Sequence, residues 1–211
     1  MASPSVPRQP AATHRENQKA QTRALILETA RNLFEEAGFE KATMRAIAAR
    51  AQMGYGTIFK HFTNKRDLLA ACLHDAIDAT LADAFESLPA EAGLRQQFIH
   101  LARALIHHYG RRPQLSRTLI EGMIHVDGTW KTALDGQVNR FLVTLEDLVQ
   151  TAKNRGEIRD DVESALLALS LFSTYLIILA MSLRAARFDP EQTIHTLDQL
   201  VDLHLTGATT H

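Results

Sequence analysis

Apolar residues recur at helical spacing along most of the chain after residue 21. Between Thr22 and Ala37 they fall three or four positions apart, which predicts an amphipathic helix with one buried stripe. Gly38 follows, where it can take the left-handed conformation that ends many helices. The same period continues with short breaks to about residue 207 and predicts an all-α fold of about nine to ten helices.

Residues 43–62 predict two short helices joined by a tight turn. Thr43 can cap the first helix through its side-chain oxygen, and Ile47 lies on the inner face. We expect the turn at 52–54 to bury Met53 and to reverse the chain at Gly54.

The next helix, predicted at about 55–62, has two faces. Ile58 and Phe62 are four positions apart and point inward. The opposite face is too polar for a protein core and carries Tyr55, Gly56, Phe59 and Lys60, with Thr57 and His61 at its margins. A short helix with such an outward face suits the major groove of DNA.

A long helix is predicted from Lys65 to about Glu86, capped by Asn64. Lys65 lies in the first turn, where a positive charge opposes the helix dipole. We therefore expect an external anion, such as a phosphate, to contact Lys65.

These segments resemble the DNA-binding domain of the TetR family of bacterial transcriptional regulators. The matching pieces are ILETARNLFEEAGFEKATMRAIAARA, GTIFKHF and NKRDLL, within residues 22–69. The resemblance implies that Thr43 and Lys65 contact phosphates and that Arg45 and the 55–61 face (Tyr55, Gly56, Thr57, Phe59, Lys60, His61) address the groove. Two positions depart from the family, which usually has Ser or Thr at Gly54 and Tyr at Phe59.

Charge divides the chain in the way a DNA-binding protein requires. The net charge is −1, but residues 1–70 hold 11 Lys and Arg against 6 Asp and Glu, so the acidic excess lies in the rest. We predict a disordered basic tail (1–20), a helix-turn-helix domain (21–68), and a ligand-binding and dimerisation domain (69–207). The tail could lie along DNA or simply be solvated.

The second domain shows helical segments at about 91–109, 113–124 and 129–134, and then an apolar seam of alternating four- and three-residue steps from Leu134 to Ala152. Asp160 or Asp161 starts the next helix, and Asp189 followed by Pro190 starts the last. Residues 165–183 carry no charge over 19 positions. Such a helix could span a membrane, be buried by its own chain, or be covered on one side by a second copy, and we favour the last.

The resemblance also implies a homodimer that pairs through helices at about 134–154 and 162–184. The residues expected at this interface are Leu134, Val138, Phe141, Leu145, Leu148, Leu169, Leu176 and Ala180. It further implies a cavity for a small, largely apolar effector. The residues expected to line it are Leu81, Leu105, His108, Tyr109, Met123, Trp130, Phe172 and Tyr175.

Other chemistry has little support in the sequence. The single cysteine, Cys72, excludes an internal disulfide, suits a reducing cytoplasm, and lies in an apolar run that predicts a buried thiol. The scattered histidines have no metal-site spacing beyond Glu121 and His125, so we expect no metal and no cofactor. No nucleophile elbow, zinc-protease motif, phosphate-binding loop or dinucleotide fingerprint occurs, which argues against an enzyme.

The sequence thus predicts a cytoplasmic, homodimeric, ligand-responsive repressor that binds pseudo-palindromic operator DNA. Three alternatives remain open. The first is a dimer of this fold that binds a protein instead of DNA, the second is an enzyme working in the body cavity, and the third is a membrane-anchored regulator.

Overall fold

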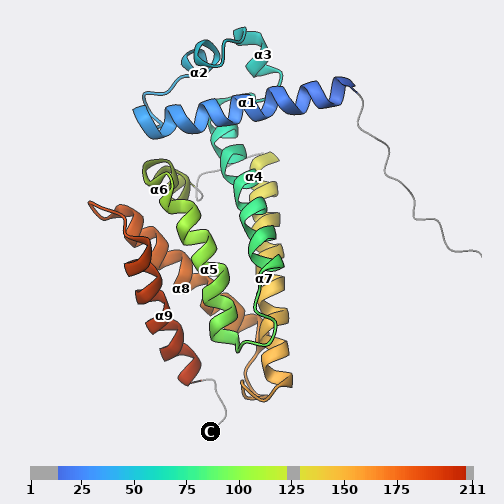
Figure 1. Cartoon of the computed structure of the whole chain (residues 1–211), viewed down its shortest axis with the longest axis vertical. Coiled ribbons are helices and arrows are strands. Elements are labelled where there is room, and N and C mark those ends of the chain that lie inside the picture. The colour runs from blue at the N-terminus through green and yellow to red at the C-terminus, as the bar shows by residue number, and fades with distance from the viewer. Residues whose placement is uncertain (1–13, 123–128, 208–211) are drawn as a thin grey trace, which may run out of the picture.

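The computed structural model describes residues 14–122 and 129–207, and these residues form nine helices and no strand. This confirms the predicted all-α class. Helices α1–α3 form a head at one end of the molecule, and α4 runs from the head into a body made with α5–α9 (Figure 1).

The helix bounds follow the predicted segments closely at some places and not at others. The helices are α1 (His14–Ala37), α2 (Met44–Arg50), α3 (Tyr55–Phe59), α4 (Lys65–Glu86), α5 (Leu94–Gly110), α6 (Pro113–Gly122), α7 (Thr129–Asn154), α8 (Ser164–Arg184) and α9 (Pro190–Thr206). The bounds of α4 and the Asp189 cap of α9, whose side chain accepts from Gln192 N at 3.1 Å, are confirmed.

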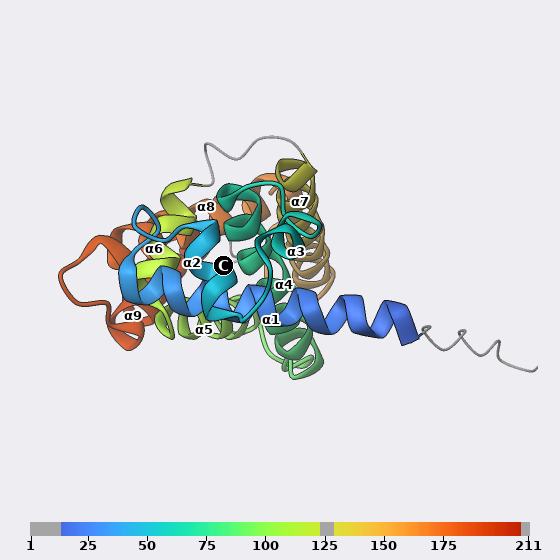
Figure 2. The same ribbon diagram turned by 90° about the horizontal axis from the view of Figure 1, so that it is seen from above.

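The head is built around α1. Seen from above (Figure 2), α1 crosses the end of α4 that enters the head. Ile26 and Phe34 of α1, Ile47 of α2 and Ile58 of α3 are buried together with Phe62. Each such side chain contributes about 1.5–3 kcal/mol when it leaves water. This small core fixes the angle at which α2 and α3 leave α1.

The prediction of disorder over residues 1–20 is wrong for its last seven residues, which begin α1. The segment from His14 to Ala20 contains Glu, Gln, Lys and Ala, all strong helix formers, and it is continuous with the amphipathic part of α1. The prolines that suggested a disordered tail all lie within residues 1–13, outside the described residues.

Three further bounds differ from prediction. α5 begins at Leu94, with Gly93 as its cap, instead of at about residue 91. The segment predicted separately at 129–134 is the first part of a continuous α7. α8 begins at Ser164 after a Glu163 cap that makes no side-chain hydrogen bond, so Asp160 and Asp161 belong to the preceding turn.

The head contacts the body through α4 and also through a set of polar contacts between α1 and α6. Glu35 of α1 accepts a hydrogen bond from the backbone N–H of Leu115 at 2.8 Å, in the first turn of α6. Glu28 of α1 pairs with Arg112 at 2.7 Å, just before α6. We call these the junction contacts. Because these contacts join α1 of the head to the start of α6 in the body, they constrain how the head can rotate on the body.

Cys72 lies where α4 crosses α1 and is only 2% exposed, as the apolar run predicted. Burial raises the pKa of its thiol to about 12. The thiol therefore stays protonated and unreactive in the folded protein.

Two glycines allow a matched test of the backbone. Gly38 has a φ of 80° and open space around its missing side chain, so Gly38→Ala should destabilise by about 1–2 kcal/mol through backbone strain alone. Gly136 lies inside α7, where an added Cβ would meet Arg140 Nη1 at an ordinary 3.6 Å. Gly136→Ala should therefore stabilise by up to about 1 kcal/mol. Chemical denaturation of both variants measures the two signs, and a stabilised Gly38→Ala would contradict the assignment.

Candidate DNA-binding surface and effector cavity

The turn between α2 and α3 is built differently from the prediction. Thr43 caps α2 as expected, its Oγ1 accepting from Ala46 N at 3.1 Å. The residue with left-handed backbone is Gln52, at φ 53°, whereas Gly54 has an ordinary extended conformation at φ −64°. The chain therefore reverses at Gln52, and Met53 is half-buried instead of fully buried.

Helix α3 is also shorter than predicted, because it ends at Phe59 and residues 60–61 form a turn. Its cap residue, Gly54, offers no side-chain hydrogen bond, and Gly56 lowers the helix propensity of a five-residue segment. Ile58 and Phe62 still anchor it in the head core, as predicted. The short helix thus depends on tertiary packing for its position.

The outward face of α3, together with Arg45 of α2, carries an exposed cluster that we call the aromatic patch, composed of Arg45, Tyr55 and Phe59. Tyr55 is 47% exposed and Phe59 is 40% exposed. Their ring centroids lie 4.7 Å apart, and the Arg45 guanidinium carbon lies 5.7 Å from the centre of the Tyr55 ring. The patch combines a cation, a hydroxyl and two apolar rings on one surface, which can contact phosphates, base edges and thymine methyl groups.

The remaining residues predicted to contact DNA lie around this patch. Lys60 and Gly56 are exposed, while Thr57 and His61 are half-buried. Thr43 is exposed at the start of α2, and its hydroxyl proton is not used by the cap. The structure thus brings all of these predicted residues to the same end of the molecule.

Lys65 has partners inside the head that the sequence did not predict. Its Nζ donates to the carbonyl oxygen of Phe39 at 2.6 Å and to that of Glu40 at 3.3 Å, and it lies 4.1 Å from the centre of the Phe39 ring. An ammonium has three donors, so one is left for a phosphate. Lys65 therefore helps to hold the loop after α1, besides its expected role with DNA.

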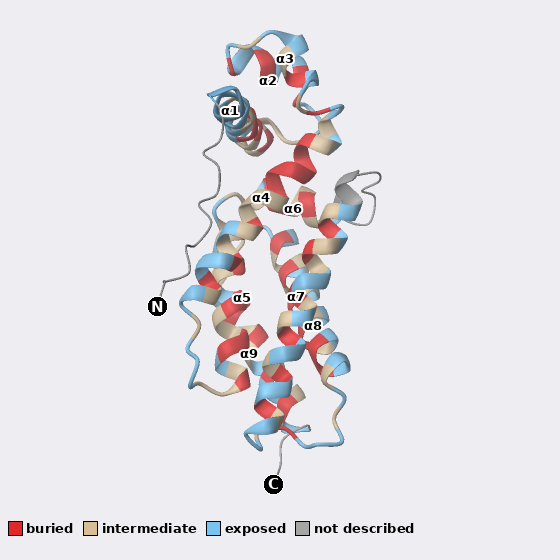
Figure 3. Cartoon of the chain, turned by 90° about the vertical axis from the view of Figure 1, so that its right-hand side faces the viewer, coloured by how far each residue is buried: buried red, intermediate tan, exposed pale blue. Residues whose placement is uncertain are grey.

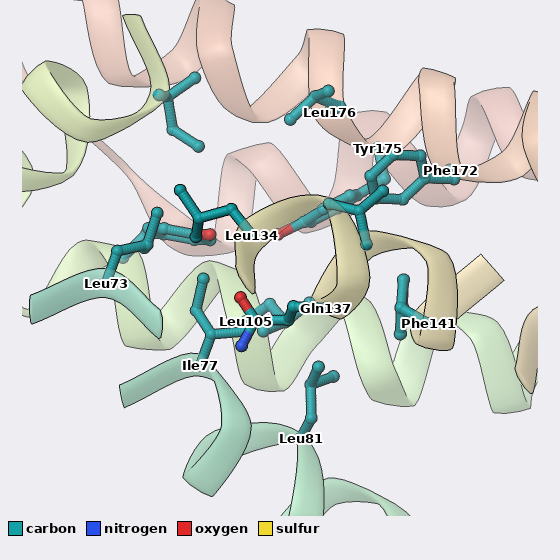
Figure 4. Close-up of a pocket in the computed structure, with 13 residues that line it drawn as sticks. Leu73, Ile77, Leu81, Leu105, Leu134, Gln137, Phe141, Phe172, Tyr175 and Leu176 are labelled. Atoms are coloured by element: carbon teal, nitrogen blue, oxygen red, sulfur yellow. The ribbon is translucent and has the colours of Figure 1, made fainter. Parts of the chain in front are cut away.

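A small apolar cavity lies in the body between α4, α5, α6, α7 and α8 (Figure 4). Its volume is about 50 Å³, which is room for only a few water molecules. The residues that line it are Leu73, Ile77, Leu81, Leu105, Tyr109, Ile120, Leu134, Gln137, Val138, Phe141, Phe172, Tyr175 and Leu176.

Polar groups in the cavity wall are few and specific. The hydroxyls of Tyr109 and Tyr175 are buried in the wall and interact with each other, and burial raises the pKa of both well above the ordinary value. They therefore remain neutral, and each can donate a hydrogen bond to a ligand. Gln137 is 6% exposed and donates to His74 O at 3.0 Å and to Asp78 Oδ1 at 2.7 Å.

Five of the eight residues predicted to line a cavity do so: Leu81, Leu105, Tyr109, Phe172 and Tyr175. His108 is not part of the wall, because its Nδ1 lies 2.9 Å from Thr80 Oγ1 between α4 and α5. Burial first, and then the charge of Arg111, lowers the pKa of His108. Met123 and the side chain of Trp130 lie outside the described residues.

Two of the missed lining residues, Leu73 and Ile77, could have been found from the sequence. They precede the predicted Leu81 at four-residue steps on α4 and mark one stripe of that helix. Gln137 gave no such signal, because a lone glutamine in an apolar seam has no distinguishing pattern.

The assignment of Leu134, Phe141 and Leu145 to a dimer interface is wrong. They are 6%, 6% and 1% exposed within a single chain, so the α7 seam packs on the chain's own helices. Leu134 and Phe141 line the cavity, as do the half-buried Val138 and Leu176. Leu148 and Ala180 are half-buried, and Leu169 is 47% exposed on α8.

The exposed apolar side chains of the body lie mainly on α8, whose exposed positions are pale blue in Figure 3. Leu166, Leu169, Ile177 and Met181 are 60%, 47%, 57% and 64% exposed, and Val143 of α7 is 50% exposed. We call these five residues the α8 face. α8 is also long and apolar enough to cross a membrane by length and composition, with a mean hydropathy of 2.2 and 33% of that window buried.

No group of three His, Cys, Asp or Glu side chains in the described part of the chain is placed to hold a metal ion. His125, which the sequence paired with Glu121, lies outside that part.

Known proteins resemble this chain in sequence and in fold. The family model described as "Bacterial regulatory proteins, tetR family" matches residues 26–72. The HTH-type transcriptional repressor AcnR of Corynebacterium diphtheriae is 32% identical over 154 residues, covering 72% of this chain and 73% of the relative. The regulator UidR of Escherichia coli is 26% identical over 161 residues, covering 74% and 80%.

Among solved structures, the regulator FadR of Bacillus subtilis in complex with stearoyl-CoA superposes with a TM-score of 0.72 at 16% identity. The match covers 89% of this chain and 99% of that one. The head with its α2–turn–α3 unit defines a helix-turn-helix, DNA-binding transcriptional regulator. The chain belongs to the TetR family of bacterial regulatory proteins.

The buried tyrosine pair can be tested by a double-mutant cycle. Tyr175→Phe leaves the Tyr109 hydroxyl buried without its partner, which should cost about 1–3 kcal/mol of stability. Tyr109→Phe should cost a similar amount. The double variant should lose less than the sum, because two apolar groups replace both partners. Urea denaturation measures the cycle, and strictly additive losses would show that the two hydroxyls do not interact.

Proposed function

We propose that this regulator is a homodimeric repressor that binds pseudo-palindromic operator DNA in the cytoplasm and is released by a small, largely apolar effector. The observation that carries the DNA-binding part is the aromatic patch. Two aromatic rings are exposed on a five-residue helix that is anchored by Ile58, and the Arg45 guanidinium of α2 lies beside one of them. Exposed aromatic side chains are unfavourable in water unless a partner covers them.

The dimer is supported by the α8 face. Four large apolar side chains on one helix are each about half exposed or more, and Val143 of α7 is similarly exposed. A second copy related by two-fold symmetry would cover this face with the same residues. It would also present two α3 helices, as half-sites about 34–36 Å apart on DNA require.

The effector site is supported by the cavity and its wall. The wall is almost entirely apolar, with the two tyrosine hydroxyls and the Gln137 amide as polar groups. The related fold of Bacillus subtilis FadR holds stearoyl-CoA, a ligand with a long apolar chain. Because the cavity here is only about 50 Å³, an effector larger than a few atoms must separate α4 from its neighbours.

Release follows from the continuity of α4. This helix begins at Lys65 in the head, and its residues Leu73, Ile77 and Leu81 line the cavity. A ligand that pushes α4 outward therefore tilts the head and changes the spacing between the two α3 helices. Effector and DNA then prefer different states, so each weakens the binding of the other by the same factor.

Selection of genomic fragments by the purified protein, followed by fluorescence anisotropy, tests the DNA-binding surface. Tyr55→Ala should weaken the preferred sequence roughly 10- to 100-fold and leave random DNA less affected, because a base contact is worth about 1–3 kcal/mol. Lys65→Ala should weaken preferred and random DNA alike. Leu203→Ala, an exposed change on α9, serves as the control. If no duplex is selected while a cellular protein is captured, the chain acts through a protein partner.

The dimer is tested by introducing a charge into the α8 face. Ile177→Glu should convert the dimer into a monomer, because two carboxylates would be buried against apolar residues at the two-fold interface. Leu203→Glu places the same charge on an equally exposed leucine of α9 and should leave the dimer intact. Sedimentation velocity distinguishes the two outcomes. A wild-type protein found only in the membrane fraction of cells would instead favour a membrane-spanning α8.

A further inference from the structure

The first two turns of α1 extend beyond the head core. Residues 14–21 are exposed, and the first fully buried residue of α1 is Ile26. In Figure 1 this end of α1 projects sideways past α3, beyond the other helices of the head. The extension contributes little to the core, so its sequence is free to serve another purpose.

That extension carries a row of cations on one face. Arg15, Lys19 and Arg23 are four positions apart and therefore lie above one another along the helix. Arg23 pairs with Asp75 of α4. Arg15 and Lys19 have no ion-pair partner among the described residues. Like charges at this spacing repel one another, which favours a polyanion as their partner.

A groove joins this row to the end of the recognition segment. Arg15, Gln18, Lys19 and Thr22 of α1 form one wall, and Met53, Thr57 and His61 lie in the other, with Gln21 and Leu25 also lining the groove. The cations of α1 thus face a histidine that follows α3 directly.

The groups around His61 change the pKa of its imidazole. Burial first, and then the charges of Lys19 and Arg23, lowers the pKa of His61. Arg15 also lines the groove, Asp75 of α4 pairs with Arg23, and Lys60 precedes His61 in the chain. The imidazole is therefore mostly neutral at pH 7, and a nearby anion would favour its protonated form.

We propose that Arg15 and Lys19 of the α1 extension and His61 after α3 form a second phosphate-binding site for duplex DNA, and that His61 takes up a proton when this site is occupied. The inference rests on the proposed DNA-binding function. It adds Arg15 and Lys19, which the family resemblance did not name, and it assigns a phosphate contact to His61, which the resemblance placed at the groove.

The position of the site decides which part of DNA it can reach. Lys65 binds the carbonyls just beyond the C-terminal end of α1, whereas Lys19 lies near the N-terminal end. Along a straight α-helix, Lys19 and Ala37 are about 27 Å apart at 1.5 Å per residue. The major groove is only about 12 Å wide. The two sites therefore contact phosphates on opposite sides of the groove or beyond it, and together they lengthen the footprint of each protomer.

The first test is a salt series with the full-length dimer on its selected DNA fragment. Lys19→Gln should lower the slope of log K against log salt by about 2 per dimer, since each lost phosphate contact changes it by about 0.9. Binding at about 0.1 M salt should weaken roughly 10- to 100-fold. Arg15→Gln should act in the same direction.

The matched control is Arg159→Gln, which removes one positive charge from the turn between α7 and α8, at the opposite end of the molecule (Figure 1). It should leave the slope unchanged. If Lys19→Gln and Arg159→Gln have the same slope as the wild type, the second phosphate site does not exist, while the proposed repressor function stands.

The second test is the pH dependence of DNA binding. Because His61 has a lowered pKa when free and a raised one beside phosphate, affinity should rise as pH falls through the bound-state pKa and level off below the free-state pKa. Between these values log K should change by up to about one unit per pH unit for each His61 that is protonated.

His61→Gln should remove this dependence, and His195→Gln, an exposed histidine on α9, should retain it. A His61→Gln variant with the full wild-type pH dependence overturns proton uptake at His61. A Lys19→Gln effect on random DNA without any selected fragment would support the phosphate site and contradict the sequence-specific regulator. Absence of any DNA binding by the wild type would overturn both.

Discussion

The continuity of α4 is the constraint on which the rest of the structure depends. Its first turns pack in the head, where Leu68 is fully buried and Cys72 lies against α1, and its next turns line the cavity through Leu73, Ile77 and Leu81. A rigid helix cannot move at one end only, so the packing in the body sets the direction in which the recognition surface points. The junction contacts at Glu28 and Glu35 add a second link, through α6.

The head and the body present surfaces of different chemistry to their partners. The cations of the head are partly neutralised within the chain, as Arg50 is by Glu36 at 2.5 Å and Arg23 is by Asp75. Arg45 lies beside the exposed Tyr55 ring, and Arg15 and Lys19 line the groove next to His61. The α8 face carries no charge at all. One end therefore suits a polyanion and the opposite part suits an apolar partner, which keeps the two interactions from competing.

Periodicity and caps were enough to predict most helices, and the residues that the motif in 22–69 assigned to DNA contacts lie together at one end of the structure. The pattern could not distinguish a stripe that packs on the same chain from one that packs on a second copy, because both need the same spacing. This is why Leu134, Phe141 and Leu145 were misplaced. The prediction of the turn was wrong for a similar reason. Glycine at position 54 permits a left-handed backbone but does not require it, and Gln52 adopts it instead.

In the proposed effector site, the small volume of the cavity, about 50 Å³, determines how sensitive such a sensor can be. If only a small fraction of molecules is open at any moment, the measured dissociation constant exceeds the intrinsic one by the inverse of that fraction. Under the proposed mechanism, tight packing around Tyr109 and Tyr175 sets a threshold concentration below which the effector has little influence on gene expression. Substitutions that change how well the wall packs would raise or lower that threshold without changing any contact to the effector.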